Sequence, residues 1–408
     1  MVMGSLNQRI GIAVILAILF GLILRHYQSL QLVEFTIPIL EIIGDVFILL
    51  LKMIMIPLIF FSLISSISSL KKNKSSQLLW KGAIFYYLST MVFAVILMMV
   101  VMNLFQDNLG GIQLGLENNQ PQLIIDSEES YSVKGTIKSL IMNPFEALSQ
   151  GNIMAVVIFA IFFGMALRSD NEHVKKIKIW ADGIFEVVMN IVNSIMTVSP
   201  VGVFALLSLL IIQQELSMFY QIGFFIVLVL GVITFHGVVF LPLLLKVFSN
   251  ESIKSFWQGI KNVLITAFAT SSSAATLPVT MSTLENDFKV NKKVSRFMLP
   301  LGATINMDGT ALYEAAVALF VASMVGVNLG LYDQIFLVFL AMAASIGAPA
   351  IPSAGMVTLA IVLSALNLPV EYVAIFIPID RLIDTFRTTV NVEGDVIGAL
   401  IIDKYFKS

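Results

Sequence analysis

The sequence predicts an all-α polytopic membrane protein with eight transmembrane helices and two re-entrant helical hairpins. Its mean hydropathy is +0.93, and 58% of its 408 residues are hydrophobic while only 12% are charged. Such a composition is typical of a chain whose helices lie in lipid. The formal net charge of −2 argues against a nucleic-acid partner, and the lack of cysteine excludes disulfides and thiolate chemistry.

Six apolar segments before residue 250 are long enough to span a bilayer. They cover about 8–25, 35–68, 79–105, 140–167, 178–212 and 217–247. Several exceed the ~20 residues that a bilayer requires, so we expect tilted or bent helices. The first segment ends in Arg25-His26 without a small-residue cleavage site, and we interpret it as a membrane helix rather than a signal peptide.

The charges between the segments predict their orientation. Lysines at 71–74 should be cytoplasmic, because basic loops remain inside. The polar connection 106–138 carries an excess of acidic residues and should lie outside. The resulting topology places the N- and C-termini in the cytoplasm. The short loops indicate a prokaryotic inner membrane.

Two later apolar stretches are interrupted by small and hydroxyl residues, at 270–278 and 345–355. Each half is too short to span, so we predict re-entrant hairpins at about 252–288 and 333–368 whose tips reach membrane depth. Flanking lysines place the first hairpin on the cytoplasmic side. No Lys or Arg lies between residues 296 and 381, so the second should enter from outside. Two broken segments of opposite orientation indicate an inverted-repeat transporter.

A polar spanning segment follows each hairpin. The first contains Asn306, Asp308 and Gly309 within an apolar run. These residues predict either an interrupted helix with free carbonyls for a cation, or a kinked helix whose Asn and Asp bind neighbouring helices.

The second polar segment, Asp380–Asp395, carries polar side chains at steps of four, three, four and four. This spacing places five polar side chains on one helix face. Ionisable groups in a lipid-embedded helix must face a cavity, a partner or a ligand. The alternative is a soluble amphipathic helix with a solvated face, which the composition disfavours. The five residues are Asp380, Asp384, Arg387, Asn391 and Asp395.

Three motifs together resemble the glutamate transporter family, which contains excitatory amino-acid transporters and archaeal sodium–aspartate symporters. They are S-S-S-A-A-T-L-P at 271–278, N-M-D-G-T-A-L-Y-E at 306–314, and D-x-x-x-D-x-x-R-T-x-x-N-V-x-G-D at 380–395. The resemblance is strongest over roughly residues 260–400, and a weaker motif lies at 199–205.

The resemblance implies a substrate site for aspartate or glutamate. Arg387 would bind the side-chain carboxylate through its planar fork, Asp384 would bind the α-ammonium, and Asp380 would support Arg387. Relatives that carry neutral amino acids lack this arginine. The alternative is a permanent Arg387–Asp384 salt bridge with no ligand. The other implied substrate-binding residues are Ser272, Ser273, Thr310, Ile351, Gly355, Thr388 and Asn391.

The resemblance also implies three sodium sites, which use carboxylates, amides, hydroxyls and carbonyls. The first would use Asp395, Asn391, Asn306 and the carbonyl of Gly302. The second would use carbonyls of Thr304, Ser345, Ile346 and Ala348. The third would use Asp308, Asn306, Tyr87 and Thr90.

Glu314 stands where the excitatory transporters have a proton-carrying glutamate and sodium-only archaeal members have glutamine. A carboxyl group buried away from water favours its protonated form. The residue therefore indicates proton coupling, with potassium counter-transport as a further possibility. The alternative is a structural, neutral glutamic acid that forms a hydrogen bond to the last helix.

Three further departures from the family pattern bear on the site. The family usually has an arginine at one of two places, which Ser271 and Thr385 occupy here, so we expect Asp384 to lack that cationic neighbour. Met91 replaces a hydroxyl residue of the third sodium site, and Ala350 replaces the tip glycine of the outer hairpin.

The resemblance implies a homotrimeric carrier in a lipid bilayer and no enzymatic activity. A scaffold (1–78 and 139–212) would hold a transport domain (79–105 and 213–408) that moves like an elevator, with 106–138 as an extracellular loop. One alternative is a proton-coupled C4-dicarboxylate carrier, whose substrate would leave the Asp384 carboxylate unpaired. Another is an ion channel or sensor, which cannot concentrate a substrate.

Overall fold

The computed structural model describes most of the chain and is helical throughout that part. Ile351 and Ala350, at the predicted tip of the second hairpin, lie outside the described residues, as does the whole of the predicted loop 106–138. The described ranges are 6–27, 31–69, 77–105, 141–150, 152–169, 171–213, 217–249, 251–348 and 355–407.

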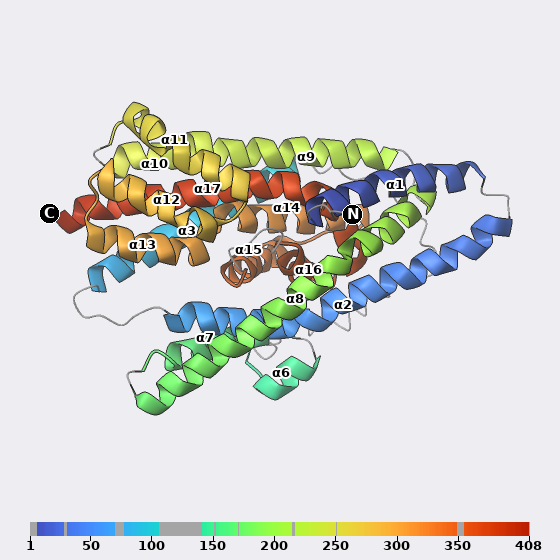
Figure 1. Cartoon of the computed structure of the whole chain (residues 1–408), viewed down its shortest axis with the longest axis horizontal. Helices are drawn as coiled ribbons and strands as arrows, with labels where there is room; N and C mark the ends of the chain where they lie inside the picture. The colour runs from blue at the N-terminus through green and yellow to red at the C-terminus, as the bar shows by residue number, and fades with distance from the viewer. Residues whose placement is uncertain are drawn as a thin grey trace, which may run out of the picture.

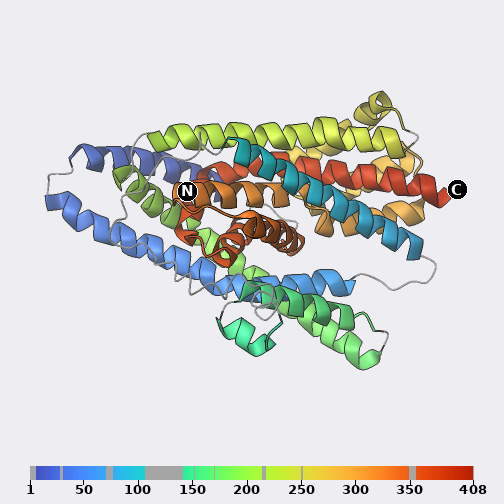
Figure 2. The same cartoon turned by 180° about the vertical axis from the view of Figure 1, so that it is seen from behind.

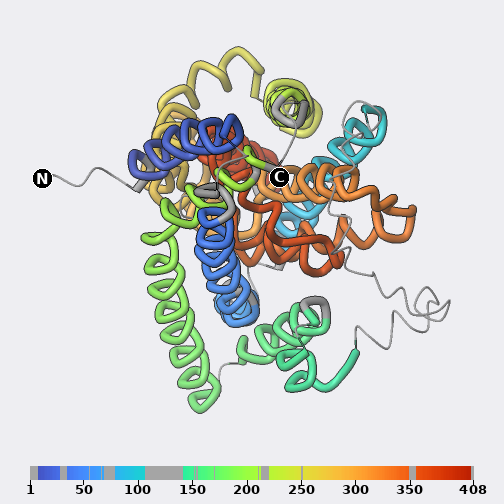
Figure 3. Tube along the Cα trace, turned by 90° about the vertical axis from the view of Figure 1, so that its right-hand side faces the viewer, coloured from blue at the N-terminus to red at the C-terminus, as the bar shows by residue number. Residues whose placement is uncertain are grey.

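Three long N-terminal helices pack together on one side of the molecule. They are α1 (Leu6–His26), α2 (Gln31–Ser69) and α8 (Glu172–Gln213). Figures 1 and 3 show α8 crossing obliquely over α2, and the two are in extensive contact. Gly202 of α8 lies directly against the Phe47 ring of α2, so no larger residue fits there. Small residues permit this close approach of two membrane helices.

The predicted segment 140–167 is not one helix but two, α6 (Pro144–Gln150) and α7 (Ile153–Ala166). Asn152 begins the second, because its side-chain oxygen accepts a hydrogen bond from the Ala155 N–H at 3.1 Å. The predicted segment 217–247 forms α9 (Ser217–Phe235), a π-helical turn η2 (His236–Phe240) and α10 (Leu241–Phe248). Such π turns are frequent at functional sites.

Two helix pairs occupy the places predicted for the hairpins. The first is α11 (Ile253–Thr270) with α12 (Ser273–Asn286), and the second is α15 (Leu331–Ile346) with α16 (Gly355–Ala365). In each pair the two helices are in contact. At the first tip, Ser271 is left-handed (φ 49°), which ends α11 within one residue and lets Ser272 cap α12.

The C-terminal helices gather around α17 (Val373–Lys407), which follows the short 3₁₀ helix η3 (Val370–Tyr372). The predicted interruption is observed, because α13 (Lys292–Ile305) and α14 (Asp308–Met324) are separated at residues 306–307. Figures 1 and 2 show α14 running beside α17 and α3 (Gln77–Leu104). All but one of the α14 residues are buried.

Five helices of the described part are long and apolar enough to cross a membrane. Large apolar side chains are exposed on them, including Ile15 of α1 and Phe85 of α3, as expected for surfaces that face lipid. The predicted count of eight spanning helices remains a prediction. The five candidate spans are Gln8–His26, Phe35–Ser65, Leu79–Leu104, Glu172–Leu209 and Tyr220–Phe248.

Glu285, near the end of α12, ties the first helix pair to α13. Its carboxylate accepts hydrogen bonds from Ser295 Oγ at 2.9 Å and Arg296 Nε at 3.2 Å. The hydrogen bonds from Arg296 and then Ser295 lower the pKa of Glu285 from its ordinary value of 4.5. The stabilisation is therefore present above that value and is lost as the pH falls through the lowered pKa of the folded state.

We predict that Glu285→Gln lowers the thermal unfolding midpoint at pH 7 by about 1–2 °C, the scale of one surface ion pair. The difference from the unsubstituted protein should shrink as the pH falls below about 4.5. Tryptophan fluorescence during heating of the purified protein measures both midpoints. Asp287→Asn, which removes the same charge nearby, is the control. An equal difference at pH 7 and pH 3.5 would contradict the assigned interaction.

Candidate functional site

Arg387 is the largest fully buried side chain in the described part of the molecule. Its Nη2 donates to Asp380 Oδ1 and to Asp384 Oδ1, each at 2.9 Å. All three groups lie on the same face of α17, as their spacing predicts. Burying a guanidinium is costly unless carboxylates and hydrogen bonds compensate it.

Three other elements enclose the guanidinium. The Tyr313 ring of α14 lies beneath it, with Arg387 Cζ 4.4 Å from the ring centroid. Gly355, the first residue of α16, is so close that an added Cβ would lie 2.7 Å from Nη1. Gly309 of α14 is packed equally tightly against the Arg387 backbone. In the described part of the chain, Nε and Nη1 have no hydrogen-bond acceptor, so the group has unused donors.

Asp384 has a cationic neighbour that the sequence analysis did not foresee. The positions where the family has an arginine are Ser271 and Thr385, but Arg381 Nη1 lies 3.9 Å from Asp384 Oδ2. The arginine that the resemblance implies is absent at both of its positions, and Arg381 of α17 provides a different cationic neighbour. The signal was present in the sequence, because residues three apart on a helix are neighbours.

Asn391 links α17 to the start of α14. Its side-chain oxygen accepts the backbone N–H of Gly309 at 2.8 Å, and its Nδ2 lies 3.4 Å from Thr310 Oγ1. Thr388, one turn earlier, is also buried. Three of the predicted substrate residues, Asn391, Thr310 and Thr388, thus lie with Arg387 where α14 and α17 meet.

The tip of the first helix pair lies beside α17. Phe268 of α11 packs edge-on against Phe386 at a centroid distance of 5.3 Å, and α12 also contacts α17. Ser272 Oγ accepts the N–H of Ala275 at 3.2 Å, and Ser273 opens α12 and is buried. The tip therefore presents a helix N-terminus, which favours a negative charge.

The residues predicted for the first sodium site come together. Asn306 Nδ2 donates to Asp395 Oδ1 at 3.0 Å and to the Asn391 carbonyl at 3.1 Å. Gly302 lies directly against Asp395, where any Cβ would collide with the carboxylate. The cluster supplies carboxylate, amide and carbonyl oxygens, the ligand type that hard cations take.

The residues predicted for the third site also meet. Thr90 Oγ1 lies 3.1 Å from Asp308 Oδ1 and 3.5 Å from Asn306 Oδ1, and it donates to the Tyr87 carbonyl at 3.1 Å. His236, the first residue of the π turn, lies beside this cluster. Its Nε2 lies 3.0 Å from Asp308 Oδ2, and both side chains are fully buried.

The residues predicted for the second site are at the end of α15 and on α13. Ser345, Ile346 and Ala348 surround the C-terminus of α15, where the last carbonyls lack helical donors. The Ser345 carbonyl accepts the Ala348 N–H at 3.0 Å. Thr304 belongs to α13, which contacts α15. Ser345 Oγ also reaches the Met91 sulfur at 3.5 Å, so Met91 contributes a thioether where the family has a hydroxyl.

Two further carboxyl groups are buried nearby. Glu314 has the Thr358 hydroxyl of α16 beside its carboxyl group. The bond to the last helix that the structural alternative requires is not seen in the described residues. Glu393, two residues before Asp395, is also buried, and its Oε1 has no partner within the same ranges. The sequence analysis assigned no role to Glu393.

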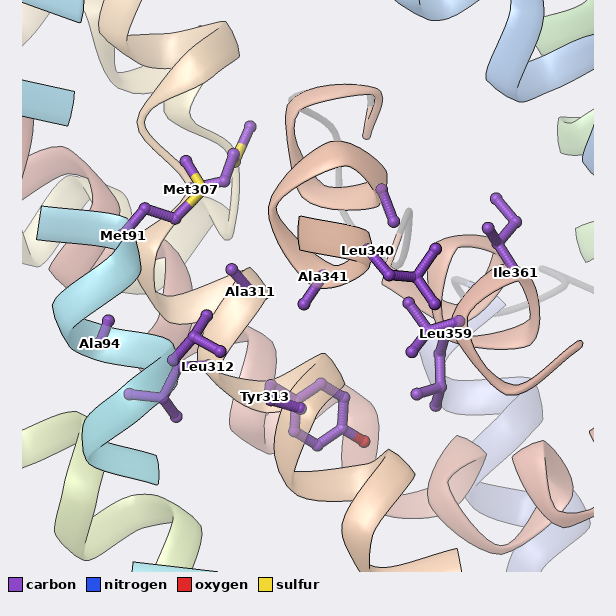
Figure 4. Packing of buried hydrophobic residues seen from close by; sticks show 14 of the residues in the cluster. Met91, Ala94, Met307, Ala311, Leu312, Tyr313, Leu340, Ala341, Leu359 and Ile361 are labelled. Atoms are coloured by element: carbon purple, nitrogen blue, oxygen red, sulfur yellow. The ribbon is translucent and has the colours of Figure 1, made fainter. Parts of the chain in front are cut away.

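Close packing holds the site residues in place. Figure 4 shows Met91 and Ala94 of α3 facing residues at the start of α14, with α15 and α16 on the other side. Met307, which is labelled there, directly precedes α14. The labelled α14 residues are Ala311, Leu312 and Tyr313, and those of α15 and α16 are Leu340, Ala341, Leu359 and Ile361.

Buried charges within helices that face lipid define a multi-pass membrane transporter with an internal binding site. A family model described as "Sodium:dicarboxylate symporter family" matches residues 6–405. The chain belongs to this family, which is a family of transporters and not of enzymes.

Known transporters are similar over nearly the whole chain. Excitatory amino acid transporter 3 of Oryctolagus cuniculus is 32% identical, covering 97% of this chain and 84% of that protein. Excitatory amino acid transporter 2 of Mus musculus is 34% identical, with 90% and 73% covered. An excitatory amino acid transporter of Caenorhabditis elegans is 32% identical, with 97% and 86% covered.

We predict that Arg387→Cys weakens aspartate binding at least about thirtyfold, because truncating one partner of a buried charge pair costs about 2 kcal/mol or more. Serine uptake should appear instead, since the cationic group that selects a side-chain carboxylate is gone. Uptake of both labelled amino acids into proteoliposomes measures the change. Arg296→Cys, at an exposed position on α13, is the matched control. Unchanged aspartate uptake by the folded variant would refute the role of Arg387.

Proposed function

We propose that this protein is a secondary active symporter of L-aspartate and L-glutamate that is driven by sodium. The observation that carries the proposal is the buried Arg387 guanidinium, whose Nε and Nη1 have no acceptor in the described residues. Unused donors on a buried cation require an acceptor, and a carboxylate supplies one that also carries the opposite charge. Membership in a family of sodium-coupled carriers supports the proposal.

The charges around Arg387 suit an amino acid with an acidic side chain. Asp384 accepts one hydrogen bond from Arg387, and its other oxygen is 3.9 Å from Arg381. When a substrate carboxylate occupies Arg387, Asp384 can turn to the substrate ammonium. The α-carboxylate would bind Asn391, Thr310 and the α12 N-terminus. The side-chain carboxylate would thereby contact a guanidinium, the ammonium would contact a carboxylate, and the α-carboxylate would lie at the positive end of a helix.

The three oxygen clusters described above would bind sodium ions. Asn306 belongs to two of these clusters and also donates to the Asn391 carbonyl, next to the proposed substrate position. An ion that orders Asn306 therefore favours the backbone arrangement that the substrate needs. Such coupling is reciprocal, so substrate must raise sodium affinity by the same factor.

We further propose an elevator-like movement of one part of the molecule against the other. Helices α1, α2, α7 and α8 pack mainly with each other and would form the trimeric scaffold. The transport domain would contain α3 and the helices from α9 to α17, with the α15–α16 pair as the extracellular gate. Both termini would be cytoplasmic, in a prokaryotic inner membrane.

Glu314 is the proposed proton carrier, and potassium would return the empty carrier. A carboxylate buried away from water is costly while charged, and Glu314 is fully buried with the neutral Thr358 hydroxyl of α16 beside it. Protonation before the movement removes that cost.

The alternatives to this proposal are a C4-dicarboxylate carrier and an ion channel or sensor. A C4-dicarboxylate carrier agrees with the family's description, but its substrate offers no ammonium group to Asp384. A channel is disfavoured because the family consists of symporters.

Uptake under separately imposed gradients tests the proposed function. We expect an inward sodium gradient to concentrate aspartate in proteoliposomes, with glutamate competing and with succinate and serine failing to compete. Proton and potassium gradients, imposed one at a time, identify the other coupled ions. Stronger competition by succinate than by either amino acid would contradict the amino-acid assignment. If aspartate did not accumulate inside the proteoliposomes, a channel would be favoured.

Glu314→Gln should make aspartate uptake independent of pH and of an imposed proton gradient, while sodium dependence is retained. Glutamine keeps the shape of the side chain but cannot carry a proton. Initial uptake rates from pH 5.5 to 8.5 give the profile, and Glu146→Gln, at an exposed position on α6, controls for the loss of one carboxylate. An unaltered pH profile would show that Glu314 is only structural.

A further inference from the structure

A cavity of about 140 Å³ lies between the N-terminal and C-terminal helices. Val14 of α1, Met196 of α8 and Met356 of α16 contribute apolar walls, and Asp380 and Arg381 of α17 contribute its polar part. Asp380 also supports Arg387 and Arg381 lies near Asp384, but the other residues that line the cavity belong to none of the sites described above.

Two polar atoms of the residues that line the cavity are unsatisfied. Asp380 is 2% exposed; its Oδ1 accepts from Arg387, but its Oδ2 has no hydrogen-bond partner in the described ranges. Arg381 Nη1 likewise has none there, since its 3.9 Å separation from Asp384 Oδ2 is too long for a hydrogen bond. Buried polar atoms are rarely left unpaired, so a water molecule or a ligand is needed at this place.

The size and charge of the cavity define what can fill it. An apolar cavity of about 150 Å³ accommodates a benzene ring. Two arginines and two aspartates meet at this end of α17, so the local charge is balanced and a neutral ligand is favoured. Asp380 Oδ2 requires a donor and Arg381 Nη1 requires an acceptor. A primary carboxamide provides both from one planar group.

We propose that this cavity binds a neutral, ring-sized molecule with one carboxamide head group, whose N–H₂ donates to Asp380 and whose oxygen accepts from Arg381. The apolar ring lies against Val14, Met196 and Met356.

Such a ligand slows transport without competing with the substrate. The walls of the cavity come from α1 and α8 on one side and from α16 and α17 on the other. These two sides belong to the two parts of the molecule that are proposed to move against each other. A ligand that fits only one arrangement stabilises that arrangement. This inhibitory consequence rests on the proposed function, whereas the binding site itself does not.

Ligand-observed ¹⁹F spectroscopy tests binding directly, with 4-fluorobenzamide as the probe and the protein left unlabelled. We expect the fluorine resonance to broaden saturably when the unsubstituted protein is added, because bound ligand tumbles slowly. Gly11 lines the cavity, and a Cβ added there would meet no atom within 4 Å, so Gly11→Leu can enter the cavity without displacing a neighbour. Gly11→Leu should abolish the saturable broadening, whereas Gly223→Leu on α9, where a Cβ is equally unobstructed, should retain it. Equal broadening with all three proteins would indicate partition into the lipid or detergent and overturn the site.

Calorimetric titration of unlabelled variants tests the ligand chemistry. Gly11→Leu, which places a side chain in the cavity, and Arg381→Met, which removes the donor, should each weaken benzamide binding at least about tenfold. Gly223→Leu should bind benzamide as the unsubstituted protein does. Ethylbenzene and benzoate should bind at least about tenfold more weakly than benzamide. The absence of saturable benzamide binding, as for a cavity that holds only water, would overturn the proposal. An equal affinity of Gly11→Leu and the unsubstituted protein for benzamide would also overturn it.

Aspartate uptake in the presence of benzamide separates this inference from the proposed function. We expect a lower maximal rate with an unchanged KM in the unsubstituted protein and no inhibition of Gly11→Leu. Benzamide binding without inhibition would count against the proposed movement and leave the binding site intact. Failure of binding, with aspartate uptake retained, would remove this site alone.

Discussion

The interaction on which the site depends is the burial of Arg387 between two aspartates of its own helix. A guanidinium out of water requires carboxylate partners, and each carboxylate requires a cation in turn. Asp380 and Asp384 meet this need from one helical face, while Tyr313 supports the guanidinium from below. Because Gly355 has no side chain, the Arg387 Nη1 group fits against its backbone. The start of α16 and the middle of α14 are therefore fixed relative to α17 by one side chain.

The interruption between α13 and α14 connects this charge centre to the oxygen clusters. Non-helical backbone at membrane depth persists only where protein or water satisfies its polar groups. Here, Asn391 accepts the Gly309 N–H, and the Asn306 side chain bridges to Asp395. The groups that repair the broken helix are the same groups that would coordinate ions. An ion and an amino acid bound here would share Asn391, so neither could bind without altering the surroundings of the other.

Much of this arrangement could be predicted from the sequence. The apolar lengths located the helices, and the spacing of Asp380, Asp384 and Arg387 predicted their contact. The break between α6 and α7 had a local signal, because the polar run Ser149-Gln150-Gly151-Asn152 ends in a residue that caps the second helix. His236 was not linked to Asp308 because 72 residues separate them and no motif joins them. The approach of Arg381 to Asp384 follows from their spacing of three on one helix and not from a family motif. The cavity between α1, α8 and α17 depends on how helices pack, which no local pattern encodes.

The short helix pairs and the broken α13–α14 unit have a consequence for biosynthesis. All five apolar helices long enough to cross a membrane, within the described residues, lie before residue 249. Helix α17 is long, but its charged face opposes entry into lipid on its own. The part of the chain after residue 248 can therefore leave the insertion machinery only by docking against helices that are already in the bilayer. The order of synthesis, with the apolar helices first, thus supplies the surface on which the polar helices assemble.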